Sequence, residues 1–174
     1  MRRMVIFLLL LLLFLSGCSS SPVQETPLEA ENSHPEINAE EMKKVELYTT
    51  VMKAAFEIEN GGNSFIAIKL DSLEGLSRRA QEKVLDNFTD LCPHVYSYEE
   101  IKDDPTKIEW YNSSFPNRAI DGTVLSVDLK EYGNDTAQIE AVSWFGSLGA
   151  VLPTYEAKYV NNHWELKLIS FAVA

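Results

Sequence analysis

Carboxylates and histidines are the side chains that could hold a metal ion in this sequence. Four carboxylates lie within six residues, in the stretch YEEIKDDP: Glu99, Glu100, Asp103 and Asp104. The stretch lacks the alternating oxygen-ligand spacing and the bend-making glycine of a calcium loop, so it is interpreted as a solvated helix and turn. The three histidines, His34, His94 and His163, do not have metal-ligand spacing. We therefore expect no metal and no cofactor.

Aromatic side chains offer a second kind of chemistry, the lining of a binding site. Trp144 falls on the outward-facing parity of its predicted strand and precedes a glycine-containing turn. It is therefore either part of an interaction patch or packed against that turn. Four other rings have inward parity and would either fill the core or line a pocket: Tyr48, Tyr155, Tyr159 and Trp164.

Hydrophobic periodicity predicts the elements that position these side chains. Apolar residues at three- and four-residue steps predict helices over 40–60 and 76–91, with Ser77 capping the second, and SFIAIKL between them predicts a strand. Region 93–118 has no regular pattern. Four further strands with short turns between them predict a consecutive antiparallel meander: 119–131, 136–145, 151–160 and 163–172.

Period-two alternation gives the predicted meander one apolar face and one charged face. A sheet with one apolar face must be covered, and the two helices are the only cover that the sequence offers. The prediction is an α+β fold, in which a curved antiparallel sheet of five strands packs against two N-terminal helices. It forms a single domain over 40–174. The inward residues of the meander include Leu125, Val127, Leu129, Ala137, Ile139, Ala141, Phe145, Trp164, Leu166 and Leu168.

The early helix and the last strands together resemble the cystatin-like α+β roll of the nuclear transport factor 2-like superfamily. The resemblance rests on residues 119–170, which end with Tyr155 and Tyr159 on one strand, an asparagine turn, and Trp164 on the next. It implies a pocket between the concave sheet face and the helices. Members of the superfamily include enzymes, ligand binders and protein-binding modules, so the fold does not select a function. The extra strand and second helix, and the region 93–118, depart from the pattern.

In enzymes of this fold an acidic residue on the inner face can serve as a proton-transfer base, and Asp121 is the residue that this resemblance points to. Simple alternation from Leu125 would turn Asp121 inward. The stretch IDGT is also typical of a bend or bulge at the start of a strand, which would reset the alternation. Both interpretations stay open.

The first residues have the architecture of a secretory signal. Arg2 and Arg3 precede a twelve-residue apolar run, Met4 to Leu15. A membrane-spanning helix needs about 20 apolar residues, so this run is too short for the usual span.

The tetrapeptide Leu15-Ser16-Gly17-Cys18 resembles the lipobox of bacterial lipoproteins. The resemblance implies that the signal peptide 1–17 is removed and that Cys18 carries a diacylglyceryl anchor, which would hold the protein on the extracytoplasmic side of the cell membrane. An ordinary secretory signal with an incidental cysteine is the alternative. The whole chain also resembles lipoproteins of Bacillus-type Gram-positive bacteria. Cys92 would then have no disulfide partner and is expected to be a buried, inert thiol.

Charge and composition limit the partners of the mature chain. Removing residues 1–17 deletes two of the 15 basic residues and none of the 26 acidic residues, so the formal charge falls from −11 to −13. Such a charge repels nucleic acid and argues for membrane attachment through the lipid alone. Residues 18–39 are rich in Ser, Pro, Glu and Asn and predict a disordered tether.

The sequence thus predicts a non-enzymatic, lipid-anchored extracytoplasmic module that binds a membrane-protein partner or a small ligand. One alternative is a small pocket enzyme that uses Asp121 in acid/base chemistry. Another is a purely structural envelope protein.

Overall fold

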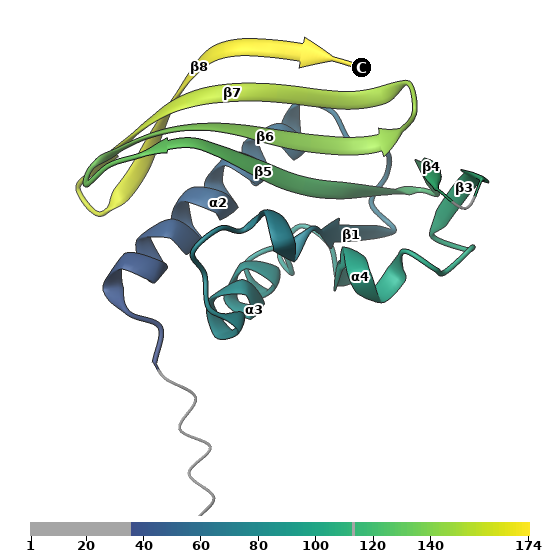
Figure 1. Cartoon of the computed structure of the whole chain (residues 1–174), viewed down its shortest axis with the longest axis horizontal. Helices are drawn as coiled ribbons and strands as arrows, with labels where there is room; N and C mark the ends of the chain where they lie inside the picture. The colour runs from purple at the N-terminus through teal and green to yellow at the C-terminus, as the bar shows by residue number, and fades with distance from the viewer. Residues whose placement is uncertain (1–35, 113) are drawn as a thin grey trace, which may run out of the picture. The chain divides into compact units, whose positions relative to one another are not determined.

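A computed structural model describes residues 36–112 and 114–174. These residues form a mixed α+β fold with an open sheet of eight strands and three helices (Figure 1). The predicted signal peptide, Cys18, His34 and nearly all of the predicted tether lie outside the described residues.

The predicted first helix is confirmed as α2 (Ala39–Ile58), and its first turn also fixes the second helix. The Asn38 side chain accepts a hydrogen bond from the backbone of Glu41 at 2.9 Å, and the Glu41 carboxylate completes a capping box. The same carboxylate accepts a 2.7 Å hydrogen bond from the backbone of Ser77, which caps α3 (Arg78–Asp86) as predicted. One side chain therefore joins the N-termini of both helices.

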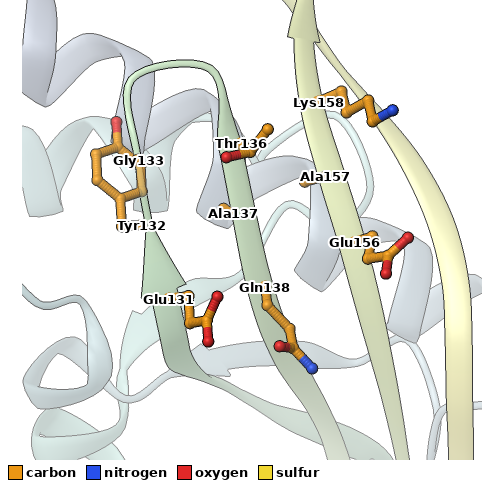
Figure 2. Close-up of a pocket in the computed structure, with 9 residues that line it drawn as sticks. All are labelled: Glu131, Tyr132, Gly133, Thr136, Ala137, Gln138, Glu156, Ala157 and Lys158. Atoms are coloured by element: carbon orange, nitrogen blue, oxygen red, sulfur yellow. The ribbon is translucent and has the colours of Figure 1, made fainter.

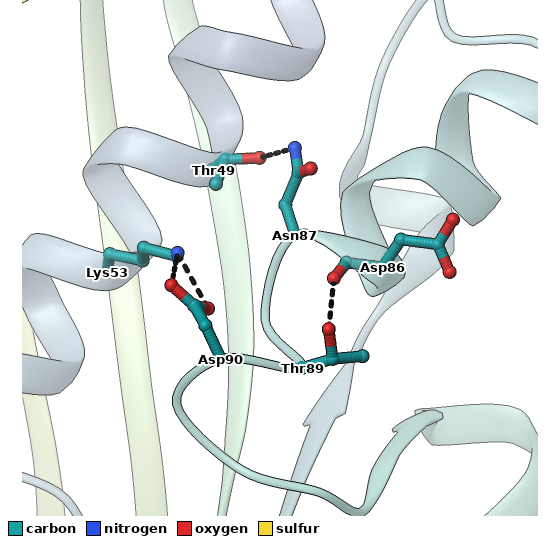
Figure 3. Close-up of polar contacts among 6 residues, drawn as sticks. All are labelled: Thr49, Lys53, Asp86, Asn87, Thr89 and Asp90. Atoms are coloured by element: carbon teal, nitrogen blue, oxygen red, sulfur yellow. Dashed lines mark hydrogen bonds and ion pairs between the residues drawn. The ribbon is translucent and has the colours of Figure 1, made fainter.

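Helix α3 ends at Asp86, five residues before the predicted end. Beyond it the chain makes polar contacts with α2 (Figure 3). Asn87 donates to the Thr49 hydroxyl at 3.2 Å, and Asp90 pairs with Lys53 at 3.0 Å. These contacts hold the chain in turns where periodicity alone predicted another helical turn.

The predicted antiparallel meander is confirmed, and each strand pairs with the next in the chain. Asn161 and Asn162 form its last turn with φ of 51° and 63°, the left-handed conformation that tight hairpins require. The four strands are β5 (Gly122–Tyr132), β6 (Thr136–Gly146), β7 (Gly149–Val160) and β8 (His163–Val173).

The prediction of five strands was wrong, because four shorter strands accompany the meander. The predicted early strand is β1 (Phe65–Ile68), which runs parallel to β5, and β2 (Val95–Ser97) runs parallel to β1. β3 (Ile108–Asn112) and β4 (Phe115–Ala119) form a hairpin, and β4 contacts the end of β6. Three of these four strands come from the region that showed no pattern, because short strands are defined by distant partners rather than by local periodicity.

Both faces of the sheet carry apolar cores. Helices α2 and α3 cover the concave face, where Tyr48, Ile66 and Leu125 belong to the main core. The opposite face was predicted to be charged, yet near β1 it carries a second core that the segment from β2 to β4 covers. This second core consists of Phe65, Ala67, Ile101, Ile108, Ala119 and Val124.

Strand β8 is an edge strand, and among the described strands it pairs only with β7. Trp164 at its start is buried as predicted, with 4% of its surface exposed, whereas Leu168 is 51% exposed. The prediction that Leu168 belongs to the covered face was therefore wrong, because the cover of the concave face ends before the second half of β8.

We predict that Glu41 makes stability depend on pH. Hydrogen bonds from Ser77, and then from the Asn38 backbone, hold the pKa of Glu41 below its usual value. A lowered carboxyl pKa stabilises the fold above the unfolded pKa, and this contribution disappears as the pH falls through the folded pKa. In urea unfolding, Glu41→Gln is expected to be less stable than the unmodified protein near neutral pH, and this gap should close below about pH 4.

The control is Glu46→Gln in the same helix, for which the gap to the unmodified protein should not follow this pattern. A Glu41→Gln gap that is equally large in acid would contradict the role of the charged carboxylate.

Candidate functional site

The inward aromatic residues are mostly core residues. Tyr48, Tyr155 and Trp164 have at most 5% of their surface exposed. The Tyr48 hydroxyl donates to the carbonyl oxygen of Glu74 at 2.8 Å, and burial raises the pKa of Tyr48 to about 12. The indole N–H of Trp164 donates to the carbonyl oxygen of Lys43 at 2.9 Å. These side chains fill the space between α2 and the meander.

Tyr159 lies at the margin of this core and is half-buried. Its ring centroid is 5.2 Å from that of Trp164, and the Lys43 ammonium lies 4.3 Å from the Tyr159 centroid. The contact is an aromatic pair with a cation over one face, and contacts of this kind stabilise the fold.

Asp121 lies in the turn between β4 and β5, where it is exposed. Its φ of 56° is in the left-handed region, and its carboxylate accepts a hydrogen bond from the Ser64 hydroxyl. Its carbonyl oxygen accepts from the Ser64 backbone at 2.9 Å. Gly62 passes so close that a Cβ there would lie 2.4 Å from an Asp121 carboxylate oxygen. Sequence offered an inward-pointing carboxylate or a bend at the start of the strand, and these contacts are those of a bend.

Three of the four carboxylates of the acidic stretch, Glu99, Glu100 and Asp104, make local contacts. Lys107 hydrogen-bonds to Asp104 and is the main reason why the pKa of Asp104 falls to about 2. Glu99 pairs with Lys102, and Glu100 completes the capping box of α4 (Tyr98–Ile101). Within residues 36–112 and 114–174, His, Cys, Asp and Glu form no group of three that could hold a metal ion.

The cysteine and the two described histidines differ in burial. Cys92 is 1% exposed and donates from its sulfur to the carbonyl oxygen of Asn63 at 3.2 Å. His94 and His163 are exposed, and His163 follows the asparagine turn.

One hollow on the outer face lies at the end of the β5–β6 hairpin and measures about 380 Å³. Figure 2 shows that Glu131, Gln138 and Glu156 reach it from three neighbouring strands. The three residues pair in register across β5, β6 and β7, and Glu156 also pairs with Lys167 at 3.0 Å. A polar row of this kind is typical of a solvated sheet face.

A second hollow, which we call the Trp144 hollow, lies farther along the outer face and measures about 280 Å³. It forms where the second core ends: Val124 belongs to that core, Trp144 packs against it, and Trp144 is directly opposite Val124 in the sheet. The lining residues come from β4, β5, β6, the start of α4 and the position directly after β1: Lys69, Tyr98, Pro116, Val124, Ser126, Val142 and Trp144.

The charge at the Trp144 hollow comes from Lys69. Its backbone N–H donates to the carbonyl oxygen of Leu125 at 2.9 Å, which fixes the residue beside β5. Its ammonium lies 5.3 Å from the centroid of the Tyr98 ring. Burial, followed by the negative charge of Glu99, raises the pKa of Tyr98, so this hydroxyl stays protonated.

Of the residues proposed from sequence, Trp144 is the one that lines this apolar hollow. Val124 and Val142 could have been noticed, since both are apolar on a face that otherwise reads as charged. Lys69, Tyr98 and Pro116 gave no signal, because their proximity depends on the path of the segment from β2 to β4.

Comparisons with protein-family models, with curated proteins and with solved structures found no match for this chain. Among the described helices, none has the length and apolar composition needed to cross a bilayer.

We predict that Asp121 contributes through its backbone conformation. Asparagine tolerates positive φ, so Asp121→Asn should change the free energy of unfolding by less than about 0.5 kcal/mol. A β-branched residue is strained there, so Asp121→Val should cost about 1–2 kcal/mol or more. Urea unfolding would measure both, and equal stability of the two variants would contradict this role.

Proposed function

We propose that this protein is a lipid-anchored extracytoplasmic binding module that holds its ligand or partner at the Trp144 hollow. The observation that carries the proposal is the hollow itself. It joins an exposed part of a tryptophan, aliphatic walls and one lysine at a place where the cover of the sheet stops. Concave, mostly apolar surfaces with a few polar groups are the usual form of binding sites.

The anchor is supported by sequence. The apolar run, the small residues Ser16 and Gly17, and Cys18 directly after them match the order of a lipoprotein signal. A composition rich in Ser, Pro and Glu before the domain fits a spacer between the membrane and the module.

We also infer that the fold is a variant of the cystatin-like roll. Support comes from the long helix α2, which packs along the concave face of a four-strand meander. In this variant the binding site is on the outer face, because core aromatic residues occupy the concave face.

The acid/base enzyme remains the alternative, and its candidate residue gains no support from its surroundings. Asp121 is exposed and bonded to Ser64, and it does not line the Trp144 hollow. General-base catalysis needs a carboxylate within hydrogen-bond reach of a bound substrate.

We predict that a photoreactive group at the hollow captures the bound molecule in intact membranes. Replacing Tyr98 with benzoylphenylalanine should give a discrete adduct after irradiation, seen as a defined increase in mass. Adding Trp144→Ala should remove the adduct, because it removes the aromatic wall, whereas Trp144→Phe should retain it.

The matched control is the same replacement at Tyr111 in β3, which is 82% exposed and does not line the hollow. Thermal unfolding of each variant checks that the second core stays folded. As a second variant, Val142→Lys places a long side chain in the hollow and keeps every ring, so it should also remove the adduct. Identical adducts from both positions, or none from Tyr98, would refute binding at the hollow.

We predict that Cys18→Ala releases or misprocesses the chain. Without the thiol no thioether-linked lipid can form, so the protein should leave the membrane fraction or retain its signal peptide. Fractionation with mass analysis of the N-terminus is the measurement, and Cys92→Ala is the control. Membrane retention of a cleaved Cys18→Ala chain would rule out the anchor.

A further inference from the structure

We infer that the Trp144 hollow binds a small monocarboxylate with an aromatic or branched aliphatic body. The inference rests on the proposed binding function and adds the chemical class of the ligand. Three features carry it: the size and apolar character of the walls, an excess of hydrogen-bond donors, and a lysine that has no carboxylate partner within residues 36–112 and 114–174.

The walls determine the body of the ligand. Pro116, Val124, Val142 and the Trp144 ring present apolar surface to the hollow. Its volume of about 280 Å³ is just below the usual range for drug-sized ligands, roughly 300–1,000 Å³. An aromatic ring or a branched chain would gain the burial of its apolar surface here.

The polar lining determines the kind of head group. None of the lining residues carries a carboxylate or a carboxamide. Lys69 and Trp144 can only donate, while Ser126 and Tyr98 can donate or accept. Within the described part of the chain, neither the Trp144 indole N–H nor the Ser126 hydroxyl has a hydrogen-bond partner. The chemical complement is a group rich in acceptors.

Lys69 determines the charge of that group. The chain is acidic, with 26 acidic against 15 basic residues, yet the Lys69 ammonium has no carboxylate partner among the described residues. It contacts the face of the Tyr98 ring instead. An ammonium at the edge of an apolar hollow forms a charge-assisted hydrogen bond with a carboxylate, and such bonds are stronger than neutral ones.

Two of the neighbouring carboxylates have lysines of their own. Glu99, next to Tyr98, pairs with Lys102. Asp128, two residues beyond Ser126, bonds to Lys130, which also lies near Glu140. These pairs leave the Lys69 charge for a ligand.

The test compares hydrocinnamate with its neutral amide, hydrocinnamamide, which has the same body. The full chain in detergent micelles is titrated with each probe while the indole N–H resonance of Trp144 is followed by NMR. The Trp144→Phe spectrum assigns the resonance. We expect the acid to shift it saturably and to bind at least about tenfold more tightly than the amide.

Lys69→Met is expected to lower the affinity for hydrocinnamate about tenfold and to leave that for hydrocinnamamide unchanged. Lys158→Met is the matched control, since Lys158 is exposed on β7 at the hairpin end of the sheet and outside the hollow. It should bind both probes as the unmodified protein does.

Equal affinity for the two probes would overturn the inference, as would equal effects of the two lysine variants. If both probes bind equally and Trp144→Ala abolishes their binding, the proposed binding site stands and only its preference for an anion is wrong. If neither probe shifts the Trp144 resonance, the ligand class is wrong. The photocrosslinking result at Tyr98 then decides the binding function independently.

Discussion

Strand β1 is buried on both of its faces, and the rest of the structure is arranged to satisfy that constraint. Ile66 and Ile68 point into the main core, while Phe65 and Ala67 point into the second core. A parallel strand at this place needs cover on both sides. Helices α2 and α3 supply one cover, and the segment from β2 to β4 supplies the other. The long meander is held in place because β5 pairs directly with β1.

The two covers differ in extent, and this difference produces the candidate site. The helical cover fills the concave face as far as the first half of β8. The cover on the outer face is short and ends beside Trp144 and Val142, so apolar strand residues remain partly open there. The backbone of Lys69 is bonded to β5 at this same boundary, which brings a positive charge to an apolar edge. Apolar surface beside a lysine that has no carboxylate partner among the described residues is therefore a direct result of how the sheet is covered.

This arrangement also separates the proposed function from the alternative, a small pocket enzyme that uses Asp121. The concave face is occupied by Tyr48, Tyr155 and Trp164, and the polar atoms of Tyr48 and Trp164 bond to backbone carbonyls. Asp121 serves a turn on the outside of this core. The proposed site is therefore a hollow on the outer face of the sheet rather than an enclosed chamber between the sheet and the helices.

The sequence by itself determined the elements whose signal is local. Period-two and period-3.6 patterns predicted α2, β1 and the four strands of the meander, and Ser77 and the two asparagines marked a cap and a turn correctly. It also singled out Trp144, since an aromatic residue on a charged face is visible in the pattern. Only the tertiary structure decided the strands β2, β3 and β4, the early end of α3 and the exposure of Leu168. It also brought Lys69, Tyr98 and Pro116 beside Trp144. These features arise from contacts between residues far apart in the chain, which no local periodicity records.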